Sequence, residues 1–463
     1  MGFSSTAQSA NLALESVPLF LSNQSDPNIF FEIDDSGSMD WEILAKSHLS
    51  PGFAATLNNG LMYEGDFSYE IYLYPTSDNA YSADATSGGV TIVNDAVSSD
   101  WRARCSCLNV LAYDPTVTYN PWIGMSNASV TAAKSDPQLG KAGYTVTRDL
   151  SGDSYYTVTA GIPDVTDPKT TILVSSLTAS QQTNYANWYQ YHRRRSYVAK
   201  AAVASVIDSN PGYRYGLSVI NEWGTLFEEV PTSSITSYAS HNLNLIKSLN
   251  DFVWPARGTP LRTALKRTGE YFDNSSTLTQ DNGFLWVWNG TSWVYTAQGT
   301  SNITNSKLDP IISECQKNFS ILFTDGYWNG NSPGVGNTDG DGHSDTLADV
   351  ARLYYTQDLS PFADNVLPDP GETGKQKQHM VTFTVAFGIN GLLTDTDSPA
   401  DSIPNSSPTT NLGVTSNWGN PYNSDTEKVD DLWHAAFNSN GTFVGAQTPQ
   451  AVVNSLNAAL ANI

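Results

Sequence analysis

Residues 28–38 read Asn-Ile-Phe-Phe-Glu-Ile-Asp-Asp-Ser-Gly-Ser, and this stretch decides the fold. Its first half, Ile29–Ile33, is a short and mostly apolar run, which is typical of a strand buried in a parallel sheet. Its second half is a polar loop that begins at Asp34. Open α/β sheets bind their ligands outside the carboxyl ends of their strands. The stretch therefore predicts a central strand that leads into a binding loop.

Similar apolar runs recur along the chain and predict further strands at residues 215–220, 320–323 and 381–387. Helical patterns separate these runs, because apolar residues recur there at three- and four-residue spacing. The expected helices cover residues 187–207, 261–272 after Pro260, 346–355 behind a cap at Ser344 or Asp345, and 449–461. Strands that alternate with helices predict an α/β fold, namely a doubly wound, mostly parallel sheet flanked by helices.

Two stretches break this alternation. Residues 46–183 contain short alternating segments divided by Gly, Pro, Asp and Ser, which predicts a β-rich insertion. Residues 273–317 form a smaller insertion, with a hairpin expected around Asn289-Gly290. The main domain is then discontinuous and consists of residues 1–45 and 184–463. Aromatic residues of the larger insertion either form a recognition surface or make its own core.

Charge and hydropathy exclude some function classes. The chain has 463 residues, with 23 Lys and Arg against 46 Asp and Glu, giving a formal net charge of −23. Nucleic acid is therefore not an expected partner, because its phosphates would be repelled. We expect no membrane-spanning segment, since no run of about 18 apolar residues occurs. The first residues do not resemble a signal peptide, yet the polar, aromatic-rich composition is typical of a soluble secreted protein. The basic run Arg193–Arg195 is expected on a solvated helix face or in salt bridges.

Asp34, Ser36 and Ser38 form an Asp-x-Ser-x-Ser pattern directly after the first strand. Alternation along an extended loop turns the three side chains the same way, so that they offer one carboxylate and two hydroxyl oxygens. Mg²⁺ suits such a set, because it binds few protein carboxylates and keeps several waters. Taken alone, the segment is also a common turn.

Two more oxygen-bearing residues are expected beside this loop. Asp325 follows the strand at 320–323, and Thr259 stands just before a predicted helix in the sequence Gly258-Thr259-Pro260-Leu261. Both positions belong to the same edge of the predicted sheet. The five residues together predict a site for Mg²⁺ or Mn²⁺.

The order of these motifs resembles the metal-ion-dependent adhesion site of von Willebrand A domains. The resemblance implies that the hydroxyls of Ser36, Ser38 and Thr259 bind the metal directly. It also implies that Asp34 and Asp325 contact the metal directly or through water. One coordination position would stay open for a carboxylate of a protein partner.

Longer segments resemble the amino-terminal half of PilY/PilC-type proteins, the type IV pilus tip adhesins, and they cover residues 28–39, 113–122, 186–195, 315–329 and 344–351. The resemblance implies a secreted module at the pilus tip, cell surface or outer membrane of a bacterium. Its implied partners are minor pilins and a host or surface protein. The carboxy-terminal β-propeller of such proteins does not occur in this sequence, so we expect a fragment and carry over nothing that depends on the propeller.

Residues 337–345 resemble the start of an EF-hand-type loop, with alternate oxygen ligands at Asn337, Asp339, Asp341 and Asp345. The twelfth position is alanine, where such loops have a bidentate glutamate. Ca²⁺ binding and a purely polar loop that caps the next helix are the two interpretations. The six histidines show no metal-binding spacing, so each is expected to be a surface or structural residue.

The three cysteines are too few for a disulfide scaffold. In a secreted protein, Cys315 is expected to bond with Cys105 or Cys107, which would tie the large insertion to the sheet. A bond between Cys105 and Cys107, or three free thiols, are the alternatives.

These features predict an adhesion module rather than an enzyme. No Gly-x-Ser-x-Gly turn occurs, and the metal site lacks a general base beyond its own ligands. The expected function is metal-dependent adhesion at the tip of a type IV pilus, with a contribution to pilus biogenesis and twitching motility. A structural or mechanosensing role in pilus assembly, with a metal that only stabilises the fold, is the alternative.

Overall fold

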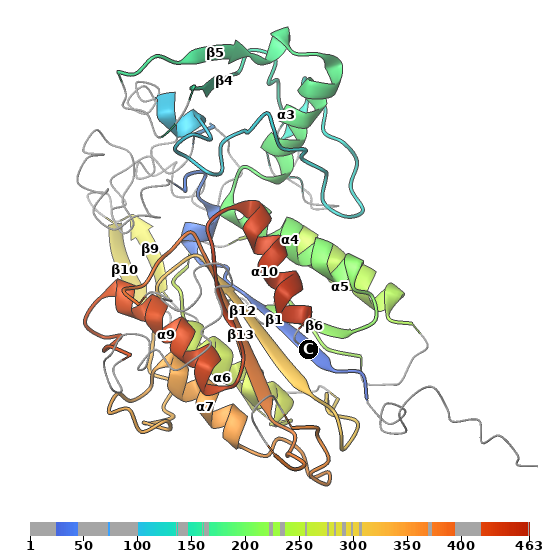
Figure 1. The fold of residues 1–463 in the computed structure, drawn as a ribbon, viewed down its shortest axis with the longest axis vertical. Coiled ribbons are helices and arrows are strands. Elements are labelled where there is room, and N and C mark those ends of the chain that lie inside the picture. Colours follow the sequence, from blue (N-terminus) through green and yellow to red (C-terminus); the bar gives the residue numbers. More distant parts are fainter. Residues whose placement is uncertain are drawn as a thin grey trace, which may run out of the picture.

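The computed structural model has at its centre a six-stranded sheet with helices on both faces (Figure 1). The structure describes residues 25–44, 73–74, 101–135, 137, 147–159, 161, 166–221, 226–231, 237–254, 257–275, 277–281, 284–288, 293–297, 300–304, 308–368, 373–393, 418–461 and 463.

The four predicted apolar runs are parallel neighbours in this sheet: β1 (Asn28–Ile33), β6 (Arg214–Val219), β12 (Asn318–Thr324) and β13 (Met380–Phe387). The strand order is β14-β13-β12-β1-β6-β7. β14 (Phe443–Ala446) is a parallel edge strand, and β7 (Phe227–Glu228) is an antiparallel one. The predicted α/β fold with a mostly parallel sheet is therefore confirmed.

Alternation along β1 explains how the sheet is covered on both faces. Ile29, Phe31 and Ile33 belong to a core formed with α4 (Arg195–Ser209), α5 (Ala239–Asp251) and α10 (Pro449–Ala461). Phe30 points to the opposite face, where it joins the core of the second helix layer. That layer consists of α6 (Leu261–Phe272), α7 (Leu347–Thr356) and α9 (Asp425–Asn438) (Figure 1).

One predicted helix is in fact two. The pattern at residues 187–207 is divided between α3 (Ala179–Tyr191) and α4, with a break from His192 to Arg194. The backbone of Arg194 is extended, with φ −114° and ψ 153°. Successive residues of a continuous helix point about 100° apart, so three consecutive arginines could not all reach buried acids without this break. The expected solvated face is wrong, and the expected salt bridges are confirmed.

The described part of the large insertion packs in a core that it shares with α3 and with Trp41 and Ile43 of the loop after β1. This part contains η5 (Trp101–Arg104), η6 (Val174–Ser176) and two short antiparallel pairs, in which β2 (Ala133–Lys134) pairs with β3 (Thr147–Arg148), and β4 (Ser154–Thr157) with β5 (Thr170–Leu173). Tyr74 and Trp122 are buried in an aromatic cluster with residues of α3. These two rings therefore serve as core rather than as contact surface. Two further aromatic residues of the insertion, Tyr69 and Tyr72, lie outside the described residues.

The smaller insertion contains two nested antiparallel pairs, as its hairpin pattern predicts. β9 (Phe284–Trp288) pairs with β10 (Trp293–Ala297), and β8 (Thr277–Asp281) pairs with β11 (Thr300–Thr304). The predicted Asn-Gly turn itself falls outside the described residues. Among the described helices, none is long and apolar enough to cross a membrane.

The structure corrects the preferred disulfide. Cys105 bonds to Cys107, which was the alternative, while Cys315 stays a thiol with its sulfur 3.3 Å from Ser313 Oγ. Cys315 precedes the amino end of β12, whereas the insertion starts beyond the carboxyl end of the parallel neighbour β1. A seven-residue strand spans about 23 Å, so the insertion and Cys315 stand at opposite ends of the sheet.

Candidate metal centre

The loop after β1 lies at the carboxyl ends of β1 and β12. From β1 the chain continues through β6 and β7 on one side, and it returns to β12, β13 and β14 on the other. The direction of winding thus reverses between β1 and β12, and open α/β sheets form their binding crevice at such a point. Asp34 N donates to Phe323 O at 2.9 Å, which places Asp34 next to the end of β12.

Both carboxylate oxygens of Asp34 accept hydrogen bonds. Ser36 N donates to Oδ1 at 2.7 Å, and Thr324 Oγ1 donates to Oδ2 at 2.6 Å. Asp34 is fully buried. This burial, together with the nearby charge of Asp325, raises the pKa of Asp34 to about 7. A cation at this place would favour the ionised carboxylate.

A chain of oxygens continues from Ser36 to Asp325. Ser36 Oγ lies 3.1 Å from Ser38 Oγ, and Ser38 Oγ donates to Asp325 Oδ1 at 3.0 Å. Ser38 is the second residue of the short η2 helix (Gly37–Asp40), and its side chain is only partly buried. The Asp-x-Ser-x-Ser pattern thus brings its three side chains to one place.

Thr259 faces the same place from the start of α6. A side-chain carbon on Gly326 would lie 3.6 Å from both Ser38 Oγ and Thr259 Oγ1, so both hydroxyls border the space beside Gly326. Two hydrogen bonds fix this approach, since Thr259 N donates to Asn329 Oδ1 at 2.8 Å and Asn329 N donates to Thr259 O at 2.9 Å. The structure therefore brings all five predicted residues together.

Arg195 is a member of this site that the sequence motif did not reveal. Its NH1 lies 2.6 Å from Asp325 Oδ2, and both side chains are buried. The same guanidinium donates to Ile43 O, which follows the metal loop in the chain. A salt bridge was one of the two expectations for the run Arg193–Arg195, but the place of Arg195 beside Asp325 depends on the break between α3 and α4.

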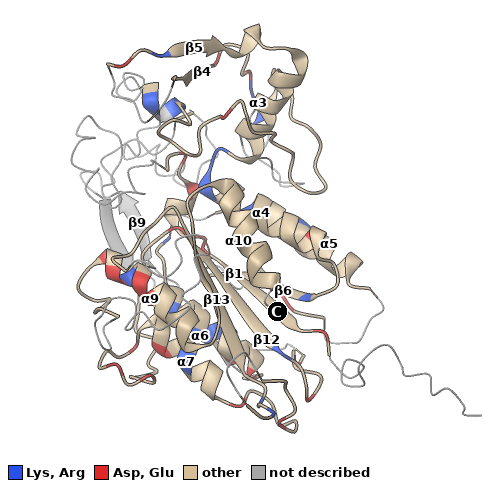
Figure 2. Cartoon of the chain, in the orientation of Figure 1, with Lys and Arg blue, Asp and Glu red and all other residues tan. Residues whose placement is uncertain are grey.

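The two preceding arginines bind acids of the same loop. Arg193 Nε lies 2.7 Å from Glu42 Oε1, and Arg194 NH1 lies 2.9 Å from Asp40 Oδ1. All four side chains are buried. In Figure 2, the basic start of α4 meets acidic residues where the sheet adjoins the insertion. The loop of the candidate site is thus held by a row of buried ion pairs.

The donor set fits a hard divalent cation. It contains two carboxylates and three hydroxyls and no nitrogen or sulfur, and Mg²⁺ and Mn²⁺ prefer such oxygen ligands. Both carboxylates are already engaged, Asp34 by two hydrogen bonds and Asp325 by Ser38 and Arg195. The three hydroxyls are therefore the groups best placed for direct contact. A bound ion would supply positive charge for an anionic partner.

The four residues of the predicted calcium loop do not converge on one point. Asp345 and Asn337 bind the backbone of the loop, whereas Asp339 and Asp341 lie near α9. Asp345 turns back along the loop, where its Oδ1 accepts from Val335 N and Gly336 N, both at 2.7 Å. Asp339 and Asp341 instead lie beside His434 of α9, and Asn337 Oδ1 accepts from Gly340 N at 2.7 Å within the loop. The helix cap is also different from the expected Ser344 or Asp345, because Thr346 caps α7 in a capping box with Asp349.

Fold and site thus define an α/β protein with an oxygen-lined centre at its sheet edge. The chain is similar to proteins named type IV pilus biogenesis factor PilY1 from Pseudomonas aeruginosa. It is 28% identical to that of strain UCBPP-PA14, over 96% of this chain and 38% of that protein. It is 26% identical to that of strain PAK, over 97% of this chain and 39% of that protein.

The chain therefore spans less than half the length of the curated relatives it matches. No family model matches the chain, and no solved structure matches it. The similarity over nearly the whole chain supports a PilY1-type pilus factor.

Proposed function

We propose that this chain is a metal-dependent adhesion module of a type IV pilus factor, built as a von Willebrand A-type domain. Mg²⁺ or Mn²⁺ would be held by Ser36, Ser38 and Thr259, with Asp34 and Asp325 in direct or water-mediated contact. The observation that carries the proposal is the convergence of these oxygens at the point where the sheet reverses its winding.

An adhesion module binds a partner through an open coordination position. The partner would be a host or surface protein that presents a carboxylate, and the ion would compensate the charges of both sides. Ser38 has the most exposed side chain of the ligand candidates. A partner would therefore reach the ion from the side of Ser38. The proposed role is binding and not catalysis, because both carboxylates of the ligand set are already engaged by hydrogen bonds and by Arg195.

The similarity to PilY1 proteins supports the cellular setting of this proposal. The module would act outside the cell, at the pilus tip, the cell surface or the outer membrane. Minor pilins of the tip are its proposed assembly partners. The module would also contribute to pilus biogenesis and twitching motility.

The Arg195–Asp325 ion pair favours a second function. It supplies a positive charge to the site from within the chain, and it connects the site to the start of α4. A metal could then serve to stabilise this junction in a protein that bears force during pilus assembly. In that case the site would have a structural or mechanosensing role, and adhesion would not depend on it directly.

Adhesion and pilus assembly can be measured separately in one experiment. We expect Asp34→Ala in the full-length protein to abolish Mg²⁺-dependent adhesion to host cells while surface pili remain. Asp149→Ala is the matched control, because Asp149 is an exposed carboxylate of the insertion. Equal loss of pili and adhesion would support the structural role. Unchanged adhesion, with and without EDTA, would refute the adhesion proposal.

A further inference from the structure

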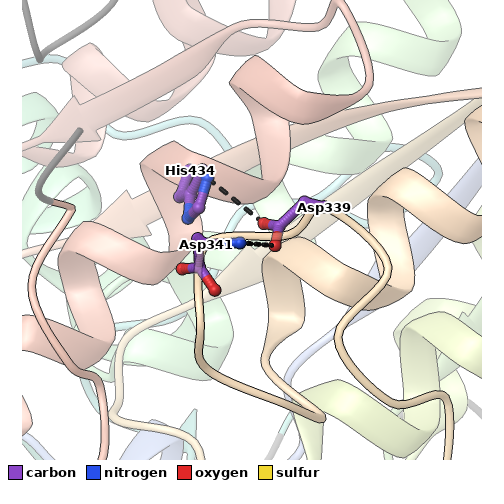
Figure 3. Close-up of side chains that lie close together, drawn as sticks. All are labelled: Asp339, Asp341 and His434. Carbon is purple, nitrogen blue, oxygen red and sulfur yellow. Dashed lines mark hydrogen bonds and ion pairs between the residues drawn. The ribbon is translucent and has the colours of Figure 1, made fainter.

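Three side chains that could bind a metal meet away from the sheet-edge site. Asp339 and Asp341 belong to the loop between β12 and α7, and His434 belongs to α9. One ligand atom from each residue lies within 4.8 Å of the other two. Figure 3 shows a ring nitrogen of His434 directed toward the carboxylate of Asp339, with Asp341 beside both residues.

The loop is shaped so that both aspartates reach the same side. Gly340 and Gly342 have φ angles of 81° and 99°, a region that residues with a Cβ rarely adopt. Asp341 N donates to Asp339 Oδ1 at 3.1 Å, and Asn438 of α9 donates through Nδ2 to Asp339 Oδ2 at 2.7 Å. The carboxylate of Asp339 is thereby fixed against α9.

His434 is held as firmly from the helix side. Its side chain is only 7% exposed, and its ring stacks on Trp418 with centroids 4.3 Å apart and planes 11° apart. Nε2 lies 3.4 Å from Asp339 Oδ2. The ring is therefore fixed in an orientation in which a nitrogen faces the carboxylates.

The carboxylates of this group face a histidine rather than a lysine or an arginine. Among the described residues, neither Asp339 nor Asp341 forms an ion pair with a lysine or an arginine. Asp349 lies close by and accepts from Thr338 N at 2.7 Å. Neighbouring carboxylates repel one another, and a bound cation would remove that repulsion.

We propose that Asp339, Asp341 and His434 form a second metal site, selective for a divalent transition-metal ion such as Zn²⁺. Calcium binds through oxygen ligands, whereas an imidazole nitrogen with two carboxylates suits zinc and its neighbours. The ion would tie the loop before α7 to α9 and leave room for water in its coordination shell. The site is independent of the sheet-edge centre, so either proposal can fail without the other.

Calorimetry of the whole chain with ZnCl₂, in saturating Mg²⁺, tests this site. We expect one zinc ion per chain, and affinity at least about tenfold weaker in Asp341→Asn, because a ligand is lost. Asp341 is exposed, so this variant is expected to fold. His343→Gln is the matched control, since it removes a histidine of the same loop that is outside the group, and it should bind zinc as the wild type does.

X-ray absorption at the zinc edge provides a second measurement. The wild type should show an imidazole in the zinc shell, and His434→Gln should lose that signal. Equal zinc affinity in the wild type and in Asp341→Asn would overturn the proposal, as would an absence of zinc binding. Displacement of zinc by an equal concentration of Ca²⁺ would refute the assigned metal class.

Discussion

Two groups of carboxylates in this protein lie in opposite electrostatic surroundings. Where the sheet meets the insertion, Asp40, Glu42 and Asp325 each contact a buried arginine, at 2.9, 2.7 and 2.6 Å respectively. On the loop before α7, Asp339 and Asp341 face a histidine instead.

The difference indicates what each group does. The arginine-paired acids have their charge compensated within the chain, so they hold two parts of the molecule together. The acids that face the histidine would gain more from a cation that comes from solution. Asp325 has both features, because one oxygen meets Arg195 and the other accepts from Ser38 in the candidate metal centre.

The largest effect is expected at the arginine-paired group, in the variant Glu42→Gln. Glu42 accepts from Arg193 at 2.7 Å and from the backbone of Leu73 and Tyr74 at 2.6 and 2.9 Å. Glutamine would leave the buried guanidinium of Arg193 without its counter-charge. The NH2 group of its amide would also face N–H donors, with which it cannot form a hydrogen bond. We expect the free energy of unfolding to fall by about 3–5 kcal/mol in urea denaturation.

The control for this variant is Asp251→Asn, at an exposed i,i+4 pair with Lys247 on α5. Such pairs contribute about 0.3–0.5 kcal/mol. If Glu42→Gln costs no more than this control, the row of ion pairs does not hold the junction together.

The next effect concerns Mg²⁺ affinity and pH. Burial and the charge of Asp325 raise the pKa of Asp34 to about 7 in the metal-free protein. Below that pH, Asp34 must lose a proton before its carboxylate can bind a metal. The affinity for Mg²⁺ should therefore fall about tenfold for each pH unit below about 7 and be constant above it. Calorimetry in two buffers of different ionisation enthalpy should detect about one proton released near pH 6. A flat pH profile would exclude Asp34 as the titrating group.

The smallest effect is expected at the histidine-facing acids, in Asp341→Asn without metal. Asparagine keeps an oxygen for the hydrogen bond from His343 N, which is 2.7 Å in the wild type, and it removes a repulsion from Asp339. In urea denaturation with EDTA, we expect a change below about 1 kcal/mol, in the stabilising direction. A loss as large as that of Glu42→Gln would remove the contrast between the two groups.

Local signals in the sequence predicted the sheet and its edge. β1, β12 and β13 are buried on both faces and read as apolar runs. Asp34, Ser36 and Ser38 come together because they are neighbours in one loop, and Asp325 joins them because parallel strands end at the same edge.

Features that depend on tertiary contacts could not be predicted in the same way. The break at His192–Arg194 arises because arginine side chains reach Asp40 and Glu42, which are distant in sequence. His434 meets Asp339 only through the packing of α9 against α7, so its spacing in the sequence carries no signal. The likeness of residues 337–345 to a calcium loop favoured Asp345, whose carboxylate instead accepts from the loop backbone.

The central claim is that the sheet edge holds a divalent cation, and a crystal structure with Mn²⁺ tests it most directly. We predict an anomalous peak about 2 Å from the hydroxyl oxygens of Ser36 and Ser38, near Asp325, with a coordination position open to solvent. The claim would be contradicted by density without such a peak, in which Ser38 still donates to Asp325 as in the metal-free protein.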